Sequence, residues 1–97
     1  MKEKELRADL KQVLQMDGWH TWFAPRVRFL KQQDIFSLWD FVYAKKKEVR
    51  FGQFTTLSNK SSHIKKIKEY RELTGLSHTG YLFLWDGKKR VWKVEKV

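Results

Sequence analysis

Four oxygen-bearing side chains near the middle of the chain have types and spacing that suit phosphodiester hydrolysis. Asp40 opens one strand-like run, and Gln53 and Thr55 lie two residues apart on the next, with Gln53 13 residues after Asp40. Asp34 precedes them. This chemistry needs a divalent cation on oxygen ligands and a group that orients the attacking water. A hairpin would bring Asp40 to Gln53 and Thr55, so the four residues form a candidate catalytic cluster, although Gln and Thr are weaker ligands than charged groups.

A strongly basic stretch overlaps this cluster. Between Lys45 and Arg71 the sequence holds nine Lys or Arg residues and only two acids. Such an excess on a turn and a helix is typical of a phosphate-contacting surface. The candidate nucleic-acid-binding residues are Lys45, Lys46, Lys47, Lys60, His63, Lys65, Lys66 and Lys68. Two alternatives stay open, since a charged helix face is often simply solvated and His63 could cap a helix.

The composition of the whole chain favours the same partner. Its 97 residues include 21 Lys and Arg against 11 Asp and Glu, and a formal net charge of +10 attracts polyanions such as nucleic acid. The absence of Cys excludes disulfides and thiolate metal sites, and the three His residues lack metal-ligand spacing. No apolar run approaches the ~20 residues that span a bilayer. We therefore expect an intracellular, cytoplasmic protein (in the host cytoplasm if it is viral) with no membrane partner.

The hydrophobic pattern predicts one domain, residues 1–97, with the element order α-β-β-β-α-β-β. The expected helices are Glu3 to Met16 and a run that starts near Ser61 or Ser62 and ends at Gly75. The expected strands are 19–29, 40–44, 48–56, 81–86 and 90–97. The predicted fold class is α/β or α+β, with a central mixed sheet flanked by helices.

Two expectations concern which side chains are buried. The second helix should bury a stripe made of Ile64, Ile67, Tyr70 and Leu73. Four of the five Trp residues lie in strand-like runs and are assigned to the core. Trp39 falls in the predicted loop between strands, so it is the one Trp kept as a candidate DNA contact.

The segment "DIFSLWDFVYA…VRFGQFTTLSNKSSHIKKI" resembles the PD-(D/E)XK nuclease superfamily, which includes Holliday-junction resolvases and type II restriction endonucleases. It is most similar to small phage and prokaryotic members with the pattern D-x-F-G-x-x-D…Q-x-T-x-x-S-N…H-x-x-K-I. The likeness covers about Trp19 to Leu73 and departs from the pattern at Ser37, where Gly is usual. It implies a restriction-endonuclease-like core, DNA as partner, Mg²⁺ or Mn²⁺ as cofactor, and a homodimer as one expected assembly.

The resemblance also implies roles for individual residues. Asp40 stands at the metal-binding aspartate, Gln53 at the acidic residue of the (D/E)XK motif, and Thr55 at its lysine. Glu5 would supply the additional acidic ligand that some members carry, and Asp34 either adds a metal oxygen or fixes the loop. Because Thr55 cannot act as a lysine, a lysine would have to come from elsewhere, with Lys45 to Lys47 or Lys65 and Lys66 as candidates.

Three functions remain open on the sequence. The first is a metal-dependent nuclease that cleaves branched or other DNA. The second is a nuclease-fold DNA-binding accessory protein of a phage or mobile element that has lost catalysis. The third, which only the aromatic surplus favours, is a protein-interaction module. At the level of structure, a hydrogen-bonded cap made by Gln53, Thr55, Ser58 and Asn59 over the sheet end is the alternative to a catalytic site.

Overall fold

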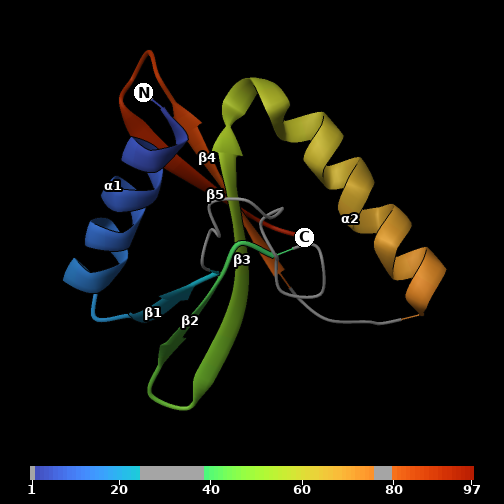
Figure 1. Cartoon of the computed structure of the whole chain (residues 1–97), viewed down its shortest axis with the longest axis horizontal. Helices are drawn as coiled ribbons and strands as arrows, with labels where there is room; N and C mark the ends of the chain where they lie inside the picture. Colours follow the sequence, from blue (N-terminus) through green and yellow to red (C-terminus); the bar gives the residue numbers. More distant parts are fainter. Residues whose placement is uncertain (1, 25–38, 76–79) are drawn as a thin grey trace, which may run out of the picture.

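The computed structural model describes residues 2–24, 39–75 and 80–97. Two α-helices, a short 3-10 helix (η1) and five strands follow the order predicted from the sequence (Figure 1). Their bounds are α1 Glu3–Met16, β1 His20–Phe23, β2 Phe41–Lys45, β3 Glu48–Thr56, η1 Leu57–Asn59, α2 Lys60–Thr74, β4 Gly80–Asp86 and β5 Val91–Lys96. The fold is therefore α+β, and the predicted order α-β-β-β-α-β-β is confirmed.

The strands form one mixed sheet in the order β1-β2-β3-β4-β5. Only β3 and β4 run parallel, because α2 carries the chain back across the sheet between them, and the other neighbours are antiparallel. The register places Phe41 opposite Gly52 and Phe51 opposite Gly80. The start of β2 consequently lies beside the middle of β3, and the second half of β3 extends beyond β2.

The two α-helices cover opposite faces of the sheet. Leu6, Leu10 and Leu14 of α1 are buried in a cluster that includes Phe54 of β3. On the other face, Ile67 of α2 packs in a second cluster with Phe51 of β3. Successive side chains of a strand point to opposite faces, so the odd and even positions of β3 serve different helices. Gln53 and Thr55 thus belong to the α2 face, as the predicted alternation requires.

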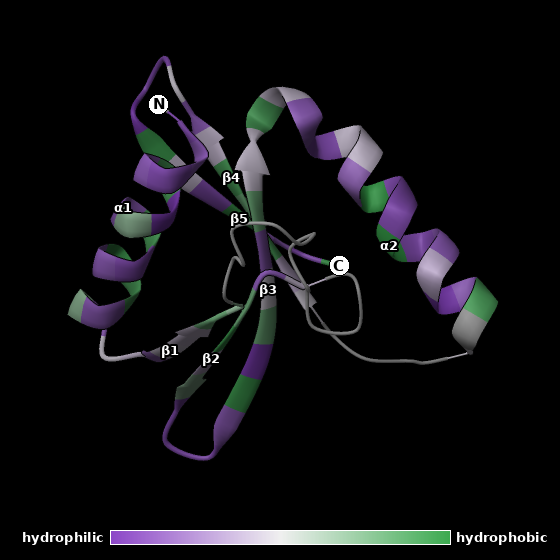
Figure 2. Ribbon diagram, in the orientation of Figure 1, coloured by the Kyte–Doolittle hydropathy of each residue, from purple (hydrophilic) through white to green (hydrophobic). Residues whose placement is uncertain are grey.

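Four details of the sequence-based prediction are wrong. Trp22, one of the four Trp residues assigned to the core, is 56% exposed. Trp39 is not a surface residue: it is fully buried beneath α2, so it cannot serve as a DNA contact. Leu73, predicted to belong to the buried stripe, is 87% exposed, because the last turn of α2 extends beyond the strands (Figure 1). Figure 2 shows that much of the surface of α2 is hydrophilic. Neither Ser61 nor Ser62 caps α2, which begins at Lys60 after Asn59.

Other parts of the prediction are confirmed or fall outside the described residues. Gly75 ends α2 with a left-handed φ of 71°, and its N–H donates to the Arg71 carbonyl. The first predicted strand is present as His20–Phe23, whereas residues 25–29 and most of the predicted loop, 30–38, lie outside the described residues. Neither helix in the described part of the chain is long and apolar enough to cross a lipid bilayer.

Candidate functional site

Asp40 is held against β3 by backbone and side-chain hydrogen bonds. Its N–H donates to the Gly52 carbonyl at 2.9 Å, and its Oδ2 accepts the Phe54 N–H at 2.9 Å. These two bonds straddle Gln53, the residue between the two partners. The predicted meeting of Asp40 with Gln53 is therefore realised, because Asp40 immediately precedes β2 and β2 pairs with this part of β3.

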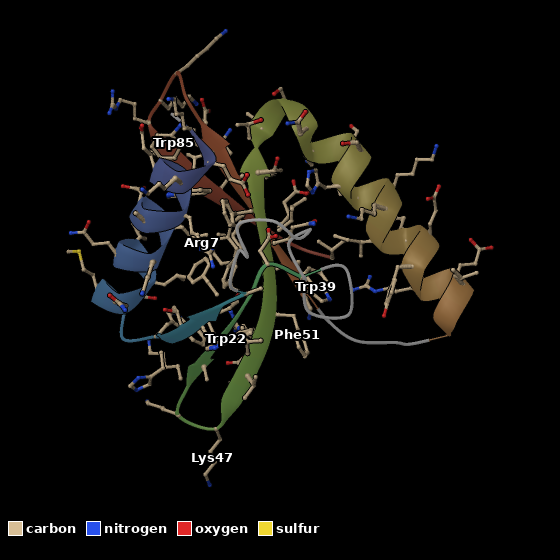
Figure 3. All side chains as sticks on the ribbon, viewed as in Figure 1. Arg7, Trp22, Trp39, Lys47, Phe51 and Trp85 are labelled. Carbon is tan, nitrogen blue, oxygen red and sulfur yellow. The ribbon has the colours of Figure 1, made fainter. Side chains whose placement is uncertain are left out.

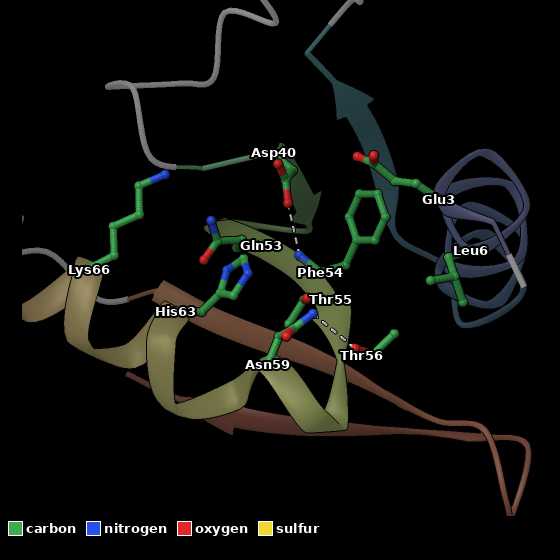
Figure 4. Close-up of a pocket in the computed structure, with 10 residues that line it drawn as sticks. All are labelled: Glu3, Leu6, Asp40, Gln53, Phe54, Thr55, Thr56, Asn59, His63 and Lys66. Carbon is green, nitrogen blue, oxygen red and sulfur yellow. Dashed lines mark hydrogen bonds between the residues drawn. The ribbon is translucent and has the colours of Figure 1, made fainter.

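A pocket of about 410 Å³ lies over this junction (Figure 4). The sheet contributes Asp40, Gln53 and Thr55 to its wall. Gln53 is only 3% exposed, an unusual degree of burial for an amide side chain. Three of the four residues in the predicted catalytic cluster thus share one cavity, and the fourth, Asp34, lies outside the described residues.

The acidic residue that α1 adds to the pocket is Glu3, not Glu5. Glu3 lines the cavity beside Leu6, and Figure 4 shows its carboxylate pointing from α1 toward the side of the pocket where Asp40 lies. Glu3 and Glu5 are both exposed, but Glu3 precedes Leu6 and Leu10 by three and seven residues and so lies in line with the buried face of α1, whereas Glu5 lies off that line. The helical spacing was the signal that could have identified Glu3.

The opposite wall comes from α2, which contributes His63 and Lys66. They are three residues apart and so lie on one helix face. Burial, together with the nearby positive charge of Lys66, lowers the pKa of His63 below its ordinary value. His63 Nδ1 is buried and has no hydrogen-bond partner among the described residues. The pocket therefore places a lysine and a neutral imidazole across from two carboxylates.

Protonation of His63 is expected to destabilise the protein as the pH falls. The unfolded chain binds this proton near pH 6.5, and the folded protein only at lower pH, so the unfolded state holds more protons between the two pKa values. The free energy of unfolding should therefore be fully retained above about pH 7 and decrease below pH 6.5. Urea unfolding from pH 5 to 8 measures this slope, and His63→Gln should flatten it. An unchanged slope in the variant would contradict the assignment.

A cluster of hydrogen-bonded polar side chains closes the end of β3 beside the pocket. The hydroxyls of Thr56 and Ser58 lie 3.1 Å apart, and Asn59 Nδ2 donates to Thr56 Oγ1 at 3.2 Å. Two of the four residues predicted to form a hydrogen-bonded cap, Ser58 and Asn59, therefore form one with Thr56. Thr56 and Asn59 also line the pocket together with Gln53 and Thr55, so the cap forms part of the pocket wall.

Most of the predicted basic residues lie away from the pocket. Lys46 and Lys47 form the β2–β3 turn, and Lys47 is six residues from Gln53 along a strand, roughly 20 Å; Figure 3 shows Lys47 at the far tip of the hairpin. Lys45 donates to the Asp17 carbonyl at 2.8 Å, and Lys60 pairs with Glu95. Lys65 and Lys68 are exposed on α2, and Lys65 is 4.0 Å from Glu69.

The carboxylate and amide side chains on the pocket wall are Asp40, Glu3, Gln53 and Asn59. Across the described ranges 2–24, 39–75 and 80–97, no three His, Asp or Glu side chains gather as a metal-ligand group. Among the four side chains on the pocket wall, the oxygens of Asp40, Glu3 and Gln53 are the candidate ligands of a hard cation, because the Asn59 amide already bonds to Thr56. Water and substrate oxygens would have to supply the remaining ligands.

No family model matches the chain, and neither the curated proteins nor the solved structures contain a match to it.

Proposed function

We propose that the protein is a metal-dependent, nuclease-like DNA-binding domain whose candidate site is the pocket over Asp40. The observation that carries the proposal is the position of Asp40, held by the Phe54 N–H beside Gln53, with a lysine facing the pair from α2. A carboxylate and an amide on one wall and a cation on the other suit a phosphodiester with its counter-ion. The formal charge of +10 favours a polyanionic partner.

The fold supports a likeness to the PD-(D/E)XK core. The resemblance implies an α-β-β-β-α-β order with the metal-binding aspartate on the second strand and the motif on the third. In this chain Asp40 directly precedes β2, and Gln53 and Thr55 are on β3. The helix after β3 crosses to a parallel β4. The positions of Asp40, Gln53, Thr55 and the parallel β4 support the likeness.

The donor set fits a small hard cation such as Mg²⁺ or Mn²⁺. Carboxylate and amide oxygens are the ligand types these ions prefer, and three protein ligands leave room for water and phosphate. When bound, such a cation polarises the phosphate and lowers the pKa of a coordinated water. In that arrangement Asp40, Glu3 and Gln53 would hold the cation, and Lys66 would stabilise the charge that develops on the phosphate. Thr55 can only donate or accept a hydrogen bond.

The alternative is a DNA-binding domain of the same fold without catalysis. Thr55, at the position that carries lysine in the motif, favours it, because a hydroxyl cannot stabilise charge as an ammonium does. The absence of a third acidic ligand in the described part of the chain favours it too, since a weaker negative field binds Mg²⁺ less tightly. In that case the protein would act as an accessory factor of a phage or mobile element by binding DNA without cleaving it.

Cleavage of a labelled DNA panel tests the proposal. Single-stranded, duplex and four-way-junction DNA are incubated with wild type over a titration of Mg²⁺ and Mn²⁺. We expect metal-dependent cleavage, which Lys66→Gln should slow roughly 100-fold. Lys11→Gln is the matched control, since it removes one charge from the exposed surface of α1, outside the pocket lining, and should leave the rate unchanged.

Three results separate the candidates. Cleavage supports the nuclease. Binding that weakens steeply with salt, without cleavage in any metal, supports the inactive alternative, because contacts to phosphate release counterions. If DNA binding is absent, or if its affinity does not change with salt, both candidate functions are contradicted and the protein-interaction role remains.

A further inference from the structure

A second pocket adjoins the candidate site at the same end of the sheet. It has a volume of about 610 Å³ and lies between η1 and the turn that joins β4 to β5. Thr56 lines both cavities, since it ends β3 between them. A linear ligand that crosses the candidate site could therefore continue into the second pocket. The volume is within the usual range of small-molecule sites, ~300–1,000 Å³.

The wall of this pocket combines an aromatic ring with an aliphatic side chain. Trp85 is half-buried, and Leu57 of η1 is 37% exposed. Trp85 is supported from behind by Trp92, whose ring centroid is 5.3 Å away. The Trp92 indole N–H in turn donates to Asp9 Oδ2 of α1 at 2.8 Å. Figure 3 shows Trp85 near α1, at the opposite end of the molecule from Lys47. The ring is thus held in place before any ligand arrives.

The rim of the pocket is basic. Lys88 and Lys89 of the β4–β5 turn line it and are exposed. Asp86 lines it as well, but its carboxylate accepts the backbone N–H groups of Lys88 and Lys89 at 3.1 and 3.2 Å. Lys93 Nζ lies 3.6 Å from the same carboxylate. The negative charge of Asp86 is therefore engaged within the turn, and the two lysine side chains set the sign of the rim.

We infer that this second pocket binds an unpaired base of the DNA strand whose phosphate occupies the candidate site, an inference that rests on the proposed function. A flat aromatic ring with an aliphatic neighbour offers a stacking surface that every base can use. The basic rim suits the phosphate that accompanies such a base. A paired and stacked base presents only its edge to a protein, so the occupant must be single-stranded or turned out of a duplex. The substrate class is consequently DNA with an unpaired nucleotide next to the bound phosphate.

Equilibrium binding without metal tests this inference apart from cleavage. A fluorescein-labelled 12-nucleotide single strand and its duplex are titrated with protein in EDTA, and anisotropy gives Kd. Leu57→Ser removes part of the stacking wall at an exposed position, and Leu73→Ser is the matched control on the far end of α2. Trp85→Ala is a second variant, with folding checked by circular dichroism because its ring also packs on Trp92.

We expect wild type to bind the single strand more tightly than the duplex. Leu57→Ser should weaken single-strand binding about 5-fold and Trp85→Ala, if folded, roughly 10-fold, with duplex binding unchanged. Leu73→Ser should match wild type. In a series of single strands that each carry one abasic site at a different position, wild type should bind one member of the series more weakly than the others. Leu57→Ser should bind all members of the series with the same affinity.

Equal affinity of wild type for single strand and duplex would overturn the inference, as would equal losses in Leu57→Ser and Leu73→Ser. Either result can occur together with metal-dependent cleavage at the first pocket, in which case the proposed function stands and only the second pocket is reassigned. Absence of salt-dependent binding to both probes would overturn the inference and the proposed function together.

Discussion

Asp40→Asn is expected to lower the rate of metal-dependent DNA cleavage on the order of 1,000-fold. Asn keeps an oxygen that can accept the Phe54 N–H, so the contact that joins the start of β2 to β3 is preserved. The substitution removes the negative charge from the pocket wall, and a neutral amide holds a divalent cation far less well than a carboxylate. Loss of that charge stabilisation is worth several kcal/mol in the transition state. Cleavage of the labelled panel at saturating Mn²⁺ measures it.

The control for this variant is Glu72→Gln, which also neutralises one carboxylate but on the exposed surface of α2. It should cleave at the wild-type rate. Urea unfolding of both variants should give free energies close to that of wild type, which separates loss of chemistry from loss of fold. Cleavage by Asp40→Asn at an undiminished rate would remove Asp40 from the site.

Gly80→Ala is expected to reduce the free energy of unfolding by about 3 kcal/mol. Gly80 begins β4, and a Cβ at this position would overlap the six-membered ring of Trp39. Trp39 is fully buried between the sheet and α2, so its ring has no space into which it can move. A loss of this size is a large part of the stability of a small domain, ~5–15 kcal/mol. Urea denaturation monitored by circular dichroism measures it.

Gly87→Ala is the matched glycine control, because a Cβ there would lie 3.7 Å from Trp85 Nε1, an ordinary contact distance. Its stability should stay near that of wild type. A double-mutant cycle with Trp39→Ala gives a further test: if the clash with the ring causes the loss, Gly80→Ala should cost much less when the ring is gone. Additive losses in the double variant would refute this explanation.

Local patterns in the sequence predicted most of the secondary structure. Helix α1 was predicted with the observed bounds because Leu6, Leu10, Val13 and Leu14 recur at helical spacing and Gly18 follows, although Val13 is 45% exposed. The bounds of β3 were also correct, since its residues alternate between the two faces. The stripe of α2 was overextended to Leu73, because periodicity shows which face of a helix is apolar but not how far the sheet beneath it reaches.

For the candidate site too, the predictions that rest on local sequence were correct, and those that depend on long-range packing were not. Asp40, Gln53 and Thr55 were brought together as predicted, because a short hairpin leaves few possible registers. Lys66 and His63 were predicted as phosphate contacts together with Lys47. The tertiary structure places Lys66 and His63 on the pocket wall, because α2 crosses the sheet there, and leaves Lys47 at the far turn. Glu3 was missed in favour of Glu5, and the burial of Trp39 was not foreseen.

The sequence alone therefore determined the order of elements, the basic character of the chain, and the meeting of Asp40 with Gln53. These depend on composition, on hydrophobic period and on contacts within one hairpin, all of which are local. Tertiary structure decided which acid of α1 and which lysine of α2 face that pair, and that Trp39 packs against Gly80. Those contacts join segments far apart in the chain, and their geometry depends on how two helices pack on opposite faces of a twisted sheet, which no local pattern records.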